Sequence, residues 1–292
     1  MRLQKRVLVS GLAALFGVMV MLMVGCGDDE GTTGPTTITG QLDDPEFVAV
    51  RSQIDDFVDS TVSFLKNGLN TIDGISDGGV IIPPQYIVDP EDQNVNLFDT
   101  SYVNGWHVIR IIYTHRNQSE QAVWQTELTD SIQYKKNGVA QETWVDRDQL
   151  LYRHHWSFDV FDTTVSYFAF DDHADFTFDD LNTTAATVTG SRELNVHAKQ
   201  VTVDSTLWWD FTFTSDVNNI TLKRSAFTGW SQCPTGGSVS AEIVMVYQKD
   251  DDDPITTTWN VTVTFNNGAV AASVTRGNTV WSYSGDVCDV PQ

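Results

Sequence analysis

The chain has 292 residues, of which 41% are hydrophobic and 11% aromatic, and its 39 acidic against 17 basic residues give a formal charge of −22. This apolar and aromatic content is enough to build a large core, and it excludes a largely disordered chain. The negative charge argues against nucleic acid or an anionic lipid surface as a partner, because both would repel the protein.

The first segment of the chain has the charge and hydropathy pattern of a secretory signal. Arg2, Lys5 and Arg6 precede an almost wholly apolar run over 7–24, which is the order of regions in a signal peptide. A membrane-spanning anchor is one alternative, since the apolar run approaches the length of a bilayer crossing. A soluble secreted form is another. The residues next to Cys26 favour a different outcome.

The residues Met23 to Cys26, MVGC, resemble the lipobox of bacterial lipoproteins. The resemblance implies a signal peptide over 1–25, a diacylglyceryl group on the Cys26 thiol, and a further acyl chain such as palmitate on the new amino terminus. Two or more acyl chains anchor a protein stably to a membrane. Gly27 stands where Asp favours inner-membrane retention in lipoproteins of the enterobacterial type. The resemblance therefore implies an outer-membrane protein that faces the periplasm or the cell surface.

The stretch after Cys26 is rich in Gly, Thr and Asp and has no apolar period. We expect 26–44 to hold the lipidated cysteine and a flexible tether that spans roughly 20–25 Å. The folded domain would then occupy 45–292. Three of the 17 basic residues lie in the signal, so the mature chain would carry 14 basic and 39 acidic residues, a formal charge of −25.

One amphipathic helix is predicted over 45–67. Asp44 suits the N-cap, Pro45 suits the first turn, and Asn67-Gly68 suits the end. Apolar residues recur at helical spacing at Phe47, Val50, Ile54, Phe57, Val58, Val62 and Leu65. We expect this stripe to pack on a sheet. Residues 70–103 follow, with glycines and prolines that predict an irregular loop.

From Trp106 onward the apolar residues recur at every second position, which predicts strands over 104–285. Clear runs lie at 122–134, 156–160, 194–198, 209–213 and 259–265. Turn signals separate the runs: Asn137-Gly138, Asp171-Asp172, Asp179-Asp180, Asp250–Pro254, Asn266–Gly268 and Arg276–Asn278.

The pattern predicts a mainly β fold with one antiparallel, meandering sheet of about 11–13 strands. We expect the sheet to be curled or barrel-like, apolar inside and polar outside, with the helix packed on it. A transmembrane barrel is the alternative. Asp, Thr and Asn interrupt most of the apolar alternate positions that a lipid-facing band would need.

Two cysteines remain besides Cys26, and an exported chain meets an oxidising compartment. Cys233 and Cys288 are therefore predicted to form a disulfide, with two unpaired buried thiols as the alternative. The separation of 55 residues would make such a bridge worth about 4 kcal/mol in the loop-entropy model.

No catalytic motif is present, and we expect neither an enzyme nor a cofactor. His154 and His155 fall on opposite faces of a strand, so the two side chains are poorly placed to coordinate one metal ion. The acidic run at Asp250, Asp251, Asp252 and Asp253 is a weak calcium candidate. It lacks the spacing and the glycine of calcium loops, so a solvated hairpin turn is the simpler interpretation.

Aromatic residues on the apolar side of the strands are the candidates for contact with a ligand. They are Trp124, Trp156, Phe158, Trp209, Phe211 and Trp259. Core packing is the alternative role for the same residues. Trp208 falls on the opposite parity, beside Asp210, and is the one tryptophan expected to be exposed.

Three functions fit these features. The first is non-enzymatic binding of a lipid or other apolar ligand inside the curled sheet, in a plan that resembles the half-barrel of periplasmic lipid carriers. The second is a structural or adhesion-type envelope module that binds protein or glycan through its acidic surface. The third is a hydrolase of envelope polymers, for which a carboxylate pair in so acidic a chain is weak support.

Overall fold

The computed structural model describes residues 37–45, 47–48, 51, 54–55, 95–116, 122–143, 147–160, 166–225, 229–230 and 233–286. These ranges are mostly β-structure. The signal peptide 1–25, Cys26, much of the tether 26–44 and most of the helix predicted over 45–67 lie outside the described residues, and they stay predictions.

Fourteen strands form the sheet in the described part of the chain. Their bounds are β1 (Ile38–Thr39), β2 (Val95–Val103), β3 (Trp106–Arg116), β4 (Ala122–Lys136), β5 (Val139–Gln141), β6 (Gln149–Val160), β7 (Tyr167–Asp179), β8 (Ala185–Val201), β9 (Thr206–Ser225), β10 (Gly229–Trp230), β11 (Gly236–Lys249), β12 (Ile255–Asn266), β13 (Ala269–Arg276) and β14 (Thr279–Asp286). β1, β5 and β10 have only two or three residues each. The eleven longer strands fall within the predicted number of about 11–13.

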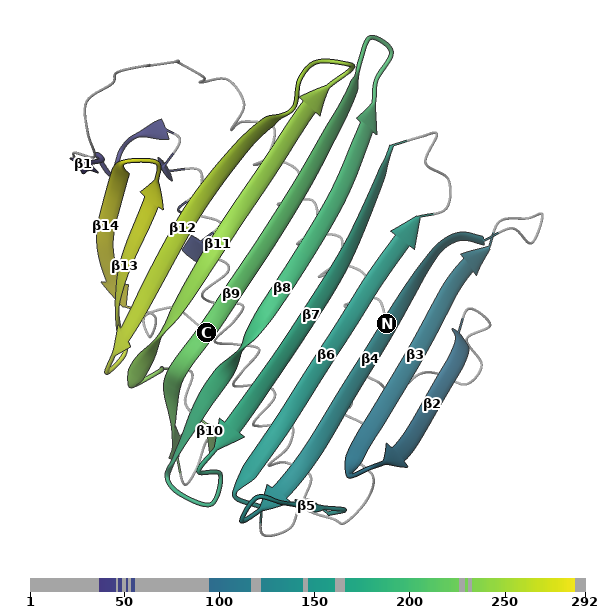
Figure 1. Cartoon of the computed structure of the whole chain (residues 1–292), viewed down its shortest axis with the longest axis vertical. Helices are drawn as coiled ribbons and strands as arrows, with labels where there is room; N and C mark the ends of the chain where they lie inside the picture. The colour runs from purple at the N-terminus through teal and green to yellow at the C-terminus, as the bar shows by residue number, and fades with distance from the viewer. Residues whose placement is uncertain are drawn as a thin grey trace.

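The strands follow one another across a single broad sheet, as Figure 1 shows. The order is β1-β14-β13-β12-β11-β9-β8-β7-β6-β4-β3-β2, with β5 beside β4 and β10 beside β9. All these long strands pair antiparallel with their neighbours, while the short β1 pairs parallel with β14. The antiparallel meander is confirmed.

The sheet is open, and the expectation of a barrel-like closure is wrong. β1 and β2 lie at opposite ends of the strand order and do not pair with each other. A sheet closes only when repeated bulges and glycine kinks bend its strands strongly. In the described registers the pairing shifts at just four points, two of them in β2 and β3 near one edge of the sheet. Alternation in the sequence carries no information on that bending.

Asn-Gly turns connect several of the strands. Asn104-Gly105, Asn137-Gly138 and Asn267-Gly268 all have positive φ at both residues, which is the geometry of a type I′ hairpin. The first of these turns joins β2 to β3. The loop predicted over 70–103 is therefore wrong at its end, because Val95–Val103 is a strand. The Asn-Gly pair that follows this strand is itself a hairpin signal.

Alternation gives the sheet an apolar face and a polar face. In β12, Trp259, Val261, Val263 and Phe265 are buried, and the residues between them are exposed. The same parity continues across the sheet and gathers the core on one face. The most deeply buried side chains there are Leu150, Phe176, Phe178, Val188, Ile220, Leu222, Val263 and Val274.

The start of the predicted helix contacts the core near β14. Phe47 is fully buried and stacks on Trp281, with 5.4 Å between the ring centroids. The Val48 amide donates to the Asp44 carbonyl at 2.9 Å, which is the spacing of an α-helical bond. The described residues thus place an N-terminal segment against the sheet, as expected, while the helix as a whole stays a prediction.

Candidate functional site

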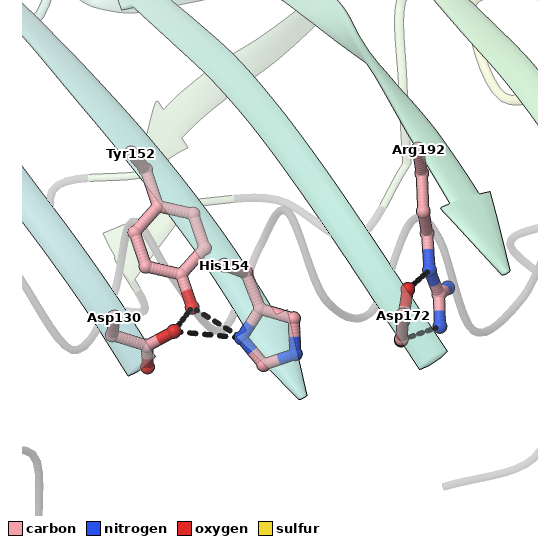
Figure 2. Close-up of polar contacts among 5 residues, drawn as sticks. All are labelled: Asp130, Tyr152, His154, Asp172 and Arg192. Atoms are coloured by element: carbon pink, nitrogen blue, oxygen red, sulfur yellow. Dashed lines mark hydrogen bonds and ion pairs between the residues drawn. The ribbon is translucent and has the colours of Figure 1, made fainter. Parts of the chain in front are cut away.

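Polar side chains interrupt the apolar face in the middle of the sheet. Asp130 of β4 lies directly opposite His154 of β6. Asp172 of β7 and Arg192 of β8 follow on the next two strands. With Tyr152 of β6, these five residues form what we call the polar row, drawn in Figure 2. Burial of so many polar groups is costly unless each one has a partner.

Asp130 is the acceptor at one end of the polar row. Its side chain is 2% exposed. Its Oδ1 accepts a hydrogen bond from the Tyr152 hydroxyl at 2.9 Å and another from His154 Nδ1 at 2.6 Å. Burial, together with the Asp130 carboxylate, raises the pKa of Tyr152 well above its usual value of 10. Tyr152 therefore stays neutral and donates, and the two donors stabilise a carboxylate that water does not reach.

Asp172 and Arg192 form an ion pair at the other end of the polar row. Arg192 donates from Nε to Oδ1 at 2.8 Å and from a terminal nitrogen to Oδ2 at 2.7 Å. The side chain of Asp172 is 6% exposed and that of Arg192 is 23% exposed. This two-pronged geometry is the strongest form of carboxylate recognition by arginine.

The polar row lies at a change in burial on β4, β6 and β7. Toward one end of these strands, the apolar side chains are fully buried, as at Tyr134, Leu150 and Phe178. Toward the other end, they are only half-buried, and most of them are aromatic. We call this second group the aromatic patch: Tyr113, Trp124, Trp156, Phe158, Phe168 and Phe170.

The rings of the aromatic patch contact one another across β3, β4, β6 and β7. Tyr113 and Trp124 stack at 5.3 Å between centroids, and Trp124 lies 5.4 Å from Phe158. Phe158 stacks on Phe170 at 5.9 Å, and Trp156 meets Phe170 edge-on at 4.8 Å. The rings thus form one connected and partly accessible apolar surface on the otherwise buried face of the sheet.

The six predicted ligand-facing residues divide between the core and the aromatic patch. Trp209 and Trp259 are 4% and 2% exposed and belong to the core, which is the alternative role expected for them. Trp124, Trp156 and Phe158 lie together in the aromatic patch, and Phe211 is half-buried on β9. Only three of the candidates therefore share one accessible surface.

The polar face carries a groove of about 480 Å³ across β4, β6, β7, β8 and β9. Its side chains on that face are Thr129, Ser131, Arg153, His155, His173, Asp175, Ser191, Glu193, Thr214 and Asp216. At its edge His155 and His173 stack at 4.1 Å between centroids, and both contact Asp171. The groove offers hydroxyls, imidazoles and carboxylates to a polar ligand.

Asp171 and Asp172 were expected to mark a turn, and that prediction is wrong. Both residues lie inside β7. Asp172 is paired with Arg192, and Asp171 accepts from His155 on the neighbouring strand. Their charges are satisfied by partners across the sheet, so the strand continues through them. Sequence reasoning missed these clusters because the pairing depends on the register between strands.

The other residues singled out in the sequence are the acidic run, Trp208 and the two cysteines. Asp250 to Asp253 form the exposed turn between β11 and β12, and the Asp250 carboxylate accepts from the Thr206 amide at 2.7 Å. The acidic run thus lies in a hairpin turn, where it was expected. Trp208 is 36% exposed, as predicted, with the Lys199 ammonium over its ring at 4.5 Å. Cys288 lies outside the described residues, so its bridge to Cys233 stays a prediction.

Comparisons with protein-family models, with curated proteins and with solved structures found no match for this chain. Among the residues that the structure describes, no helix combines the length and the apolar character that a membrane crossing requires.

Proposed function

We propose that the protein is a lipid-anchored protein of the bacterial outer membrane that binds an acyl-chain ligand, without catalysis, on the apolar face of its sheet. The lipobox-like residues before Cys26 support the anchor. The aromatic patch is the observation that supports binding of an acyl-chain ligand.

The aromatic patch has the properties of an apolar binding surface. Six half-buried aromatic residues lie side by side on four strands. A connected and partly accessible apolar surface is unfavourable in water and typically marks a place where another molecule binds. Each buried methylene of an acyl chain contributes about 0.8 kcal/mol, so a chain lying along the patch would gain several kcal/mol.

The polar row supports an amphipathic ligand over a purely apolar one. It lies at the inner end of the aromatic patch, where Trp156 is directly opposite Asp172 in the register. A polar head group placed there would meet the guanidinium of Arg192 and the ring of His154, whose side chains are 23% and 11% exposed. The acyl chain would then extend outward over the rings.

The bonding within the polar row supports binding over catalysis. Asp130 already accepts from two donors, and Asp172 is held by two bonds from Arg192. Groups fixed to one another in this way form a rigid, satisfied surface. A general acid or base would need a side chain directed at a reacting atom.

Quenching of tryptophan fluorescence by a brominated fatty acid tests the proposal. We expect dibromostearic acid to quench the native protein (residues 27–292) saturably, because bromine would approach Trp124 and Trp156. Truncating Phe158 or Phe170 to serine or alanine removes about 1.5 kcal/mol or more of apolar contact. Each of these variants should therefore bind the acid at least about tenfold more weakly.

The control for this experiment is Trp208→Ala. It removes a partly exposed aromatic side chain from the polar face and should leave the affinity unchanged. Unbrominated stearic acid should give no quenching, and the variants should unfold at nearly the native temperature. Quenching that is equally strong in Phe158→Ser and in the native protein would contradict the proposal.

The groove on the polar face favours a second candidate, an envelope module that binds a glycan or a protein through its acidic surface. Its lining of hydroxyls, carboxylates and Arg153 suits a polar partner, and Arg153 also stacks over Trp106 at 4.4 Å. A native protein whose tryptophans stay unquenched by the brominated acid would make this candidate the better one.

A further inference from the structure

Two histidines and a carboxylate converge on the polar face of the sheet. His155 of β6 and His173 of β7 are direct partners in the register, and their rings lie nearly parallel, with 9° between the planes. The Nε2 atoms of both rings contact the same Asp171 oxygen, at 2.9 Å and 3.0 Å. One ligand atom from each residue lies within 4.8 Å of the other two.

We propose that His155, Asp171 and His173 form a binding site for a divalent transition-metal ion, with Zn²⁺ as the best match. Two imidazoles and one carboxylate are a donor set that proteins use for zinc, with a further position left to water or to another ligand. Calcium and magnesium prefer sites made of oxygen ligands alone, so this donor set disfavours them.

To hold the ion, the imidazole rings must turn out of their stacked arrangement and the two histidine–carboxylate contacts must open slightly. Zinc binds nitrogen and oxygen at about 2.0–2.2 Å, so two donors of a tetrahedral site are about 3.3 Å apart. The present contacts of 2.9 Å and 3.0 Å must open by a few tenths of an ångström. The side chains of His155, Asp171 and His173 are 38%, 48% and 52% exposed, which leaves them room to turn and the ion a path from solvent.

The electrostatic surroundings also favour a cation. Glu193 of β8 is directly opposite His173 in the register, and it lines the groove together with Asp175 and Asp216. The chain carries a formal charge of −22, which raises the local concentration of cations. Arg153 lines the groove and lies on the same strand as His155. Its guanidinium forms an ion pair with Asp175 at 3.1 Å.

The metal site is independent of the acyl-chain ligand. His154 and His155 are adjacent in the sequence but point to opposite faces of the sheet, with side chains 11% and 38% exposed. The ion would link β6 to β7 on the polar face, and the aromatic patch would stay as it is. Either inference can therefore fail without the other.

Calorimetric titration of the native protein with Zn²⁺ tests the site. The protein should be expressed without a polyhistidine tag. We expect one saturable Zn²⁺ site per chain and a rise in the unfolding temperature with added Zn²⁺, because a ligand that binds only the folded state stabilises it. His173→Ala and Asp171→Asn should each weaken binding at least about tenfold, because loss of a residue that only supports a metal ligand already costs about 10–100-fold.

His197→Ala is the matched control. His197 lies on the same face and contacts Asp210 at 2.7 Å, with both side chains more than half exposed. It is thus a histidine–carboxylate pair of the same kind, on β8 and β9. We expect this variant to bind Zn²⁺ like the native protein. Unchanged affinity in His173→Ala, or an equal loss in His197→Ala, would overturn the proposal.

Discussion

Asp130 is the residue at which the apolar alternation of its strand breaks, and its partners explain why the break is tolerated. It is almost fully buried, yet Tyr152 and His154 both donate to it. Asp172 is satisfied in the same way by Arg192. The break at Asp130 is visible in the sequence. Its partners are not, because they lie on another strand and only the register brings them opposite.

The ion pair of Asp172 and Arg192 gives a testable prediction at the scale of single residues. Asp172→Ala leaves the guanidinium of Arg192 without its partner on a largely buried face, so we expect the free energy of unfolding to fall by about 3 kcal/mol. Replacing both residues with apolar ones, Asp172→Leu and Arg192→Met, should cost much less than the single change. Urea unfolding of the native protein and of these two variants measures this. A single variant as stable as the native protein would show that the pair contributes little.

At the scale of the elements, the period of two and the Asn-Gly pairs were sufficient to predict the strands and some of their turns. Two errors have different causes. The strand Val95–Val103 was missed although the Asn-Gly turn after it is a local signal, whereas the continuation of β7 through Asp171 and Asp172 depends on pairing with neighbouring strands. A local sequence window contains the alternation, but it does not contain the partner that satisfies a polar residue.

The turn between β12 and β13 bears on the predicted disulfide. The amide of Gly268 donates to the Pro234 carbonyl at 3.0 Å, which places this turn beside the residue that follows Cys233. Ala269, just after the turn, is opposite Asp286, two residues before Cys288. Cys233 and Asp286, the last described residue before Cys288, therefore lie at the same end of the sheet.

We expect the Cys233–Cys288 bridge to form in protein exported to an oxidising compartment. The denatured, unreduced chain should then be lighter than the reduced chain by two hydrogens, and reduction should lower the free energy of unfolding by about 4 kcal/mol. Equal masses before and after reduction would show that the two thiols are unpaired.

At the scale of the whole molecule, the open sheet separates two surfaces with different chemistry. The apolar face carries the core, the polar row and the aromatic patch, while the polar face carries the groove and the histidine pair. The sequence predicted the mainly β fold and the division into two faces. It did not predict the open edge or the position of the aromatic patch, because strand curvature and burial depend on contacts across the whole sheet.

Native mass spectrometry of residues 27–292, exported to a bacterial periplasm without the anchor cysteine, tests the central claim most directly. Binding of an acyl-chain ligand on the aromatic patch predicts a native mass that exceeds the chain mass by several hundred daltons. The excess should vanish on denaturation, and it should be reduced in Phe158→Ser but retained in Trp208→Ala. A native mass equal to that of the bare chain would contradict the claim.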